Sequence, residues 1–159
     1  IGKKMKRIDH IALTVPNVEE ATCFFKQAFG AEVLYDGHRP SDPAVEGPIV
    51  EAVFGMPEGC SWVHRRLIQV GDSVPIELFQ YQVEEQKEAA RTFDIGLQHL
   101  AFQVDDLQAA AQQFQEAGGQ LYPVYNPETG SLGSLSSLNG WVYGKTPWGT
   151  IIELVTFPS

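Results

Sequence analysis

The chain is poor in several features that define whole classes of protein. Its 159 residues include two cysteines, too few for a disulfide framework. Lys and Arg number 11 against 20 Asp and Glu, and the net charge of −9 disfavours binding to a nucleic-acid backbone. No apolar run approaches the length that spans a bilayer, and the stretch Ile1-Gly2-Lys3-Lys4-Met5 has no apolar segment after its lysines, as a signal peptide would. These absences favour a cytoplasmic protein without a membrane or nucleic-acid partner.

What is present is typical of a folded domain. The composition is 43% hydrophobic, 11% aromatic and 19% charged, which excludes a disordered chain, a collagen and a coiled coil. The length suits one domain that buries a core without metal or disulfide staples. Cys23 falls in an apolar helical stretch, and we expect it to pack there as a small hydrophobic side chain.

An internal repeat organises the chain. Residues 9–33 align with residues 98–122 at an offset of 89, and the identical pairs are His10/His99, Ala12/Ala101, Val15/Val104, Ala21/Ala110, Phe25/Phe114, Ala28/Ala117 and Gly30/Gly119. A later match joins Ile76-Glu77-Leu78 to Ile152-Glu153-Leu154 at an offset of 76, so the second copy is shorter by 13 residues. This many matches in register indicate a duplicated module.

Each copy reads as a strand, a helix and further strands. The first has an extended run over 7–15, then a helix that begins after Asn17 and ends at Gly30. The second has a strand over 97–104 and a helix after Asp106. Further strands are expected near 31–35, 49–55, 61–70, 74–81, 119–124, 139–145 and 150–157, and loops over 36–48 and 126–140. We therefore predict an α+β fold in one domain, 1–159, with βαβββ modules at 5–81 and 96–159 and a connector at 82–95.

Strand alternation predicts which side chains share a face. His10 shares the face away from the helix with Ala12 and Thr14, and His99 shares the corresponding face with Ala101 and Gln103. Glu77 and Glu153 each stand between an isoleucine and a leucine in a late strand. Each module therefore sends one histidine and one glutamate to the face away from its helix.

These four side chains suggest a metal site. A carboxylate flanked by apolar neighbours in mid-strand is costly unless it is paired, hydrogen-bonded or metal-bound. Two imidazoles and two carboxylates suit a divalent transition metal. The alternative interpretation is a pair of packed, hydrogen-bonded histidines and a pair of glutamates in surface ion pairs. The repeat-related placement favours one shared metal site made of His10, Glu77, His99 and Glu153.

The strand over 61–70 carries further polar residues. Simple alternation places Trp62, His64 and Arg66 on one face and Arg65 on the other. An arginine or histidine on the metal face could hold an anionic substrate group, and a solvated edge strand is the equal alternative. His38, in the loop over 36–48, is expected at the surface.

The chain resembles the vicinal oxygen chelate superfamily, which includes glyoxalase I, methylmalonyl-CoA epimerase, extradiol dioxygenases and fosfomycin or bleomycin resistance proteins. The resemblance is carried by Ile8-Asp9-His10-Ile11-Ala12-Leu13-Thr14-Val15-Pro16, Phe24-Phe25, Phe29-Gly30-Ala31, Ile76-Glu77-Leu78, Gln98-His99-Leu100-Ala101-Phe102-Gln103-Val104-Asp105-Asp106 and Pro147-Trp148-Gly149-Thr150-Ile151-Ile152-Glu153-Leu154. It implies a curled mixed sheet of paired βαβββ modules around a metal site.

The resemblance also implies a ligand set. By position, His10, Glu77, His99 and Glu153 match the glyoxalase I metal ligands, whereas the epimerases usually place Gln where Glu77 stands. The dioxygenases would use His10, His99 and Glu153. Thr14 and Tyr81 stand where glyoxalase I contacts glutathione through Arg and Asn, so a glutathione thioester is not the expected substrate. The implied cofactor is one divalent ion, Zn, Ni, Co, Mn or Fe, whose identity the sequence does not fix.

The implied activity is that of an isomerase, epimerase or lyase. The metal would chelate two adjacent substrate oxygens and stabilise an enediolate, while Glu77 or Glu153 moves a proton beside a carbonyl. The alternatives are an Fe(II) ring-cleaving dioxygenase and a resistance-type protein that sequesters a small molecule. The substrate pocket would be lined by Ala12, Thr14, Phe79, Tyr81, Ala101, Gln103 and Phe157. A homodimer is expected, with the ligands drawn from one chain or from both.

Overall fold

The computed structural model describes residues 2–158; Ile1 and Ser159, the last residue of the predicted second module, lie outside the described residues. The chain divides into two compact units, Ile1–Gln86 and Lys87–Ser159. Among residues 2–158, none of the helices combines the length and apolar character needed to cross a membrane.

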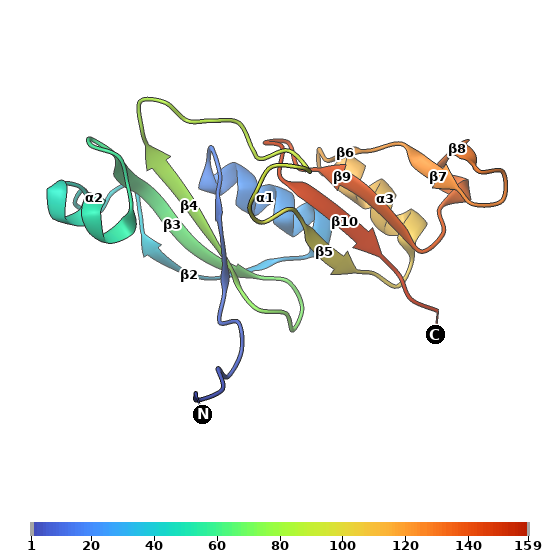
Figure 1. Cartoon of the computed structure of the whole chain (residues 1–159), viewed down its shortest axis with the longest axis horizontal. Helices are drawn as coiled ribbons and strands as arrows, with labels where there is room; N and C mark the ends of the chain where they lie inside the picture. Colours follow the sequence, from blue (N-terminus) through green and yellow to red (C-terminus); the bar gives the residue numbers. More distant parts are fainter. Residues whose placement is uncertain (1, 159) are drawn as a thin grey trace. The chain divides into compact units, whose positions relative to one another are not determined.

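The first unit contains β1 (Ile11–Thr14), α1 (Val18–Phe29), β2 (Glu32–His38), α2 (Pro48–Phe54), β3 (Ser61–Gln69) and β4 (Ile76–Gln82). Its sheet has the order β1-β4-β3-β2 (Figure 1). β1 runs parallel to β4, and the β4–β3 and β3–β2 pairs are antiparallel. The first strand of the unit therefore lies beside its last.

The second unit contains β5 (Leu100–Gln103), α3 (Leu107–Glu116), β6 (Gln120–Leu121), β7 (Val124–Asn126), β8 (Ser131–Gly133), a 3₁₀ turn (Leu135–Ser137), β9 (Trp141–Lys145) and β10 (Ile151–Val155). Its sheet has the order β5-β10-β9-β6, with β5 parallel to β10, and β7 and β8 form a separate hairpin. This topology repeats that of the first unit, and the predicted α+β fold of two βαβββ modules is confirmed.

Local sequence signals determine where the two repeat-related helices begin and where the first of them ends. The Asn17 side chain accepts a hydrogen bond from the Glu20 backbone N–H at the start of α1, and Gly30 ends the helix with φ 66°. Asp106 caps α3 in the same way through the Ala109 N–H. Phe25 on α1 and Phe114 on α3 are fully buried. The same residue types of the repeat therefore anchor each helix in the core of its unit.

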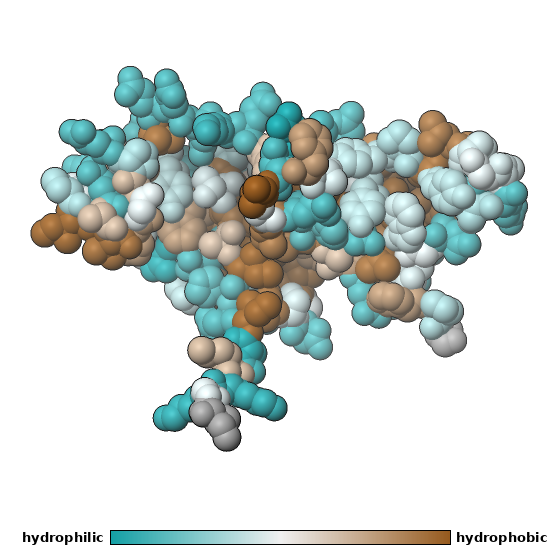
Figure 2. Space-filling model, viewed as in Figure 1, coloured by the Kyte–Doolittle hydropathy of each residue, from teal (hydrophilic) through white to brown (hydrophobic). Residues whose placement is uncertain are grey.

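Three local expectations were wrong. Residues 48–54 form helix α2 rather than a strand, because Pro48 begins the helix and Gly55 ends it in the left-handed conformation. These two signals outweigh the β-branched side chains between them. Ile49, Val53 and Phe54 on α2 are exposed, at the brown cluster on the left of Figure 2. The predicted loop over 126–140 contains strand β8. Cys23 is exposed rather than packed.

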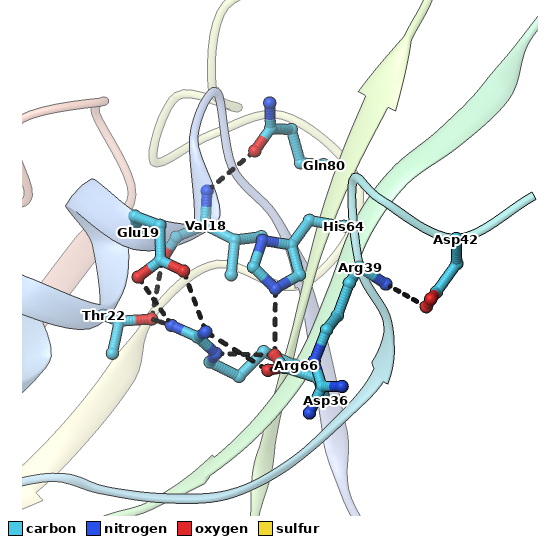
Figure 3. Close-up of polar contacts among 9 residues, drawn as sticks. All are labelled: Val18, Glu19, Thr22, Asp36, Arg39, Asp42, His64, Arg66 and Gln80. Carbon is cyan, nitrogen blue, oxygen red and sulfur yellow. Dashed lines mark hydrogen bonds and ion pairs between the residues drawn. The ribbon is translucent and has the colours of Figure 1, made fainter.

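A polar cluster fastens α1 to its sheet (Figure 3). Arg66 on β3 donates from Nε to Asp36 Oδ1 at 2.8 Å and from Nη1 and Nη2 to the Glu19 carboxylate at 2.9 Å each. His64 Nε2 lies 2.9 Å from Asp36 Oδ1, and its side chain is buried. His64 and Arg66 therefore share the helix-covered face of β3, which leaves the opposite face for other residues.

This cluster predicts a loss of stability in acid. Hydrogen bonds from Arg66, and then from His64 and Arg39, hold the pKa of Asp36 far below its ordinary 3.8. A carboxyl with a depressed folded-state pKa stabilises the fold fully above its unfolded pKa, and the contribution disappears as the pH falls towards the folded value. Wild-type protein should therefore exceed Asp36→Asn in urea midpoint at pH 6, and this excess should shrink steadily below about pH 3.8. Asp72→Asn, at an exposed aspartate, is the matched control. A wild-type excess over Asp36→Asn that stayed constant as the pH fell would contradict the assignment.

Candidate metal and acid–base site

Each unit brings one histidine and one glutamate together across its parallel strand pair. Ala12 on β1 pairs with Glu77 on β4, and Ala101 on β5 pairs with Glu153 on β10. The histidine stands two residues before the alanine in both units. Nε2 of His10 lies 3.7 Å from Glu77 Oε1, and Nε2 of His99 lies 3.1 Å from Glu153 Oε2. We call His10/Glu77 the first pair and His99/Glu153 the second pair.

The other ring nitrogen of each histidine is held by the preceding residue. His10 Nδ1 lies 2.8 Å from Asp9 Oδ2, and His99 Nδ1 lies 2.6 Å from Gln98 Oε1. The hydrogen bond to Asp9 raises the pKa of His10, burial opposes the shift, and the charge of Glu77 adds to it. An oxygen acceptor on Nδ1 fixes the orientation of the ring and directs Nε2 towards the glutamate, as outer partners do for metal-binding histidines.

The donor chemistry of each pair fits two ligands of a divalent metal. Each pair offers one imidazole nitrogen and one carboxylate oxygen, and both ring nitrogens of His99 face oxygen atoms, which suits a cation between Nε2 and Glu153. Within the described residues, neither unit by itself groups three His, Cys, Asp or Glu side chains that could hold a metal. Joint ligation by both pairs therefore stays a prediction.

Arg65 lies on the same face as the first pair. Its Nη1 donates to Glu77 Oε2 at 3.0 Å, and its guanidinium carbon lies 5.5 Å from the centre of the Trp62 ring. A β-bulge between Trp62 and His64 shifts the alternation, so Trp62 pairs with Tyr81 and faces the Glu77 side together with Arg65. The expectation that Trp62 shares a face with His64 and Arg66 was wrong, because simple alternation ignores the bulge.

Glu153 has a different neighbour. Tyr143 on β9 stands directly opposite it, and the Tyr143 and His99 rings meet edge to face at 5.1 Å. Burial, the nearby charge of Glu153 and a hydrogen bond with Glu153 raise the pKa of Tyr143, which keeps the phenol protonated. The two carboxylates thus differ: a guanidinium contacts Glu77, and a phenol contacts Glu153.

The predicted pocket residues lie at three places in the fold. Ala12, Thr14, Ala101 and Gln103 are exposed on β1 and β5, beside the histidines. Phe79 and Tyr81 on β4 stack at 5.7 Å with an interplanar angle of 8°. Phe157 follows the end of β10 and is 62% exposed.

His38, expected at the surface, is buried at the end of β2 against Trp62, because β2 continues three residues into the predicted loop.

Sequence reasoning missed four neighbours of the two pairs. Asp9 and Gln98 occupy the same position of the repeat, so the offset of 89 could have identified them. Alternation predicts the face of Arg65 correctly, but its contact with Glu77 depends on the register of β3 against β4, which the sequence does not reveal. Tyr143 required the register of β9 against β10, which depends on the length of the preceding turn.

Comparison with known proteins gives the family. The sequence profile of the Glyoxalase/Bleomycin resistance protein/Dioxygenase superfamily matches residues 9–133. A 2-epi-5-epi-valiolone epimerase from Actinomyces sp is 30% identical over 96% of this chain and 80% of the relative. An ethylmalonyl-CoA/methylmalonyl-CoA epimerase from Cereibacter sphaeroides is 27% identical over 80% of this chain and 82% of the relative.

Solved structures share the fold at low identity. A glyoxalase family protein from Bacillus cereus superposes with a TM-score of 0.70 at 18% identity and covers 97% of this chain and 95% of its own. The fosfomycin resistance protein FosX from Mesorhizobium loti gives a TM-score of 0.61 at 17% identity, covering 98% and 94% of the two chains. The predicted resemblance is confirmed: the chain belongs to the glyoxalase/bleomycin resistance protein/dioxygenase superfamily.

Proposed function

We propose that the chain is an epimerase that moves a proton at a carbon beside a carbonyl group. The observation that carries the proposal is the twin arrangement of His10/Glu77 and His99/Glu153, at repeat-related positions of two strand pairs. The names of both epimerase relatives add support, since together they align with most of the chain. A homodimer stays a prediction.

The four side chains of the two pairs would hold one divalent metal. When bound, the metal would supply Lewis-acid stabilisation of negative charge on substrate oxygen. Small neighbours favour a substrate beside these ligands, because Ala12 and Ala101 leave space next to each glutamate. The stacked Phe79 and Tyr81 would contact an apolar part of the substrate. A small molecule with two adjacent oxygens suits this combination.

Inverting a stereocentre needs acid–base groups that serve both faces of one carbon. One carboxylate, Glu77 or Glu153, takes the proton from the carbon, and the electron pair of the broken C–H bond moves onto the carbonyl oxygen. A carboxylic acid then returns a proton to the opposite face, which restores the carbonyl. The chain offers two carboxylates for these roles. Tyr143 can donate a hydrogen bond to Glu153 and so hold it in place.

Hydrogen exchange with the solvent tests this proposal. In D2O, metal-loaded protein should incorporate one deuterium beside the carbonyl and produce the epimer when given 2-epi-5-epi-valiolone or methylmalonyl-CoA, followed by NMR. Because general acid–base help contributes about 10²–10⁴-fold, Glu77→Gln or Glu153→Gln should lower the exchange rate by that order.

The exposed Glu116→Gln on α3 provides a matched control that should exchange at the wild-type rate. Neither compound exchanging, with tight binding of both, would instead indicate sequestration. Oxygen consumption with catechol cleavage would indicate a dioxygenase. Either result would overturn the proposal.

A further inference from the structure

Arg65 makes the surroundings of Glu77 in the first unit different from those of Glu153 in the second. It pairs with Phe79 across β3 and β4, while Trp141 pairs with Val155 at the corresponding position of β9 and β10. The guanidinium takes one oxygen of Glu77, Oε2, at 3.0 Å. The other oxygen, Oε1, faces His10 Nε2 at 3.7 Å. The first pair therefore has a positively charged neighbour, and the second pair has a tryptophan at the corresponding position.

The Arg65 guanidinium lies next to Trp62 and Gly37. The guanidinium carbon lies over the Trp62 ring, 5.5 Å from its centre. A Cβ added to Gly37 would collide with Nη2 and Cζ of Arg65, so only glycine leaves this space. The φ angle of Gly37 is not positive, and its backbone conformation is open to other residues. Glycine is therefore needed at position 37 to leave room for the Arg65 side chain, and not to allow an unusual backbone conformation.

Hydrogen bonding at this place is incomplete for Arg65, although Arg65 donates to Glu77. The Nε atom of Arg65 is buried and has no hydrogen-bond partner among the described residues. Buried donors without a partner are rare in folded proteins, and each calls for an explanation. The Glu77 side chain is only 12% exposed, so it is well shielded from water that could compete for its charge. The contact with Glu77 therefore accounts for the placement of Arg65.

We infer that Arg65 competes with a divalent cation for the Glu77 carboxylate and so sets the metal affinity of the first pair. This inference rests on the proposed ligation by Glu77. One carboxylate oxygen is already engaged, and two cations on one carboxylate repel each other. Glu77 is then the more weakly bound and more easily exchanged of the two carboxylate ligands, and Glu153 is the firmer one.

Metal affinity tests the inference directly, without an activity measurement. Titration of the full chain with Zn2+ and Co2+ by calorimetry should show tighter binding by Arg65→Met than by wild type, by about tenfold, even with water-like screening of the charges. Arg65→Lys should lie between them, because the positive charge remains. Gly37→Ala keeps every charge but places a Cβ where the guanidinium lies, so the guanidinium must shift. We expect this shift to weaken its contact with Glu77, and this variant should also bind metal more tightly.

Arg91→Met is the matched control, since it removes the same charge from an exposed arginine paired with Asp94. It should bind both metals like wild type. Should Arg65→Met fail to fold by circular dichroism, Gly37→Ala decides the question. Unchanged or weaker metal binding by the folded variants would overturn the inference while leaving the metal site in place. No binding by wild type or any variant, or wild-type affinity in Glu77→Gln, would overturn Glu77 as a ligand and the inference with it.

Discussion

His99→Ala will lose tight divalent-metal binding by more than about 100-fold, because loss of merely an outer partner of a metal ligand costs about 10–100-fold. Proton exchange beside the carbonyl will fall with it. The side chain is 23% exposed and contacts Gln98, Glu153 and the edge-on ring of Tyr143, so the fold should survive. Calorimetric titration with Zn2+ and a thermal melt of the same sample measure both quantities.

Gln112→Ala provides the comparison, since it removes an exposed polar side chain from α3. It should keep wild-type affinity and exchange. If His99→Ala bound Zn2+ as tightly as this control, the second pair would not ligate the metal, and the proposed site would have to be abandoned.

Arg66→Met will destabilise the chain by about 3 kcal/mol, since removing one partner of a buried ion pair leaves the other charge without compensation. The side chains of Arg66 and Asp36 are only 11% and 12% exposed. The same guanidinium also holds Glu19 and the Thr22 hydroxyl of α1 (Figure 3). Urea unfolding monitored by circular dichroism gives the free energy of unfolding for both proteins.

Arg39→Ala is the matched control because Arg39 contacts the same aspartate from a side chain that is 63% exposed. Exposed pairs contribute about 0–1 kcal/mol, so this change should be small. Equal losses in the two variants would mean that the charge of Asp36, and not the buried bonds of Arg66, governs the stability of the cluster.

The repeat made most of the fold predictable. Asn17 and Asp106 cap their helices, and Phe25 and Phe114 fill the two cores, because helix capping and apolar periodicity are local properties of the chain. Helix α2 was mistaken for a strand. Its Ile49-Val50 pair favours β structure by type, and the decisive signals were the flanking Pro48 and Gly55.

The candidate site was predictable in part. Alternation along β1 and β4 placed His10 and Glu77 on one face, and the structure brings them to 3.7 Å. The contact of Arg65 with Glu77 was not predictable, since it depends on the register of β3 against β4. The side of Trp62 was not predictable either, since one extra residue in the bulge reverses it. The space that Gly37 leaves for the Arg65 guanidinium depends on how the strands pack, and the sequence pattern does not reveal it.

The parallel pairing of first and last strands also fixes when each pair of ligands can form. Ile11 pairs with Ile76, and Leu100 pairs with Ile152. Closing these long loops has an entropic cost that only the final strand of each unit can offset. On the ribosome, His10 therefore emerges long before its carboxylate, and a nascent chain that stops short of β4 carries neither pair. Under the proposed ligation, metal would therefore stabilise the nascent chain only after the last strand of a unit has been synthesised.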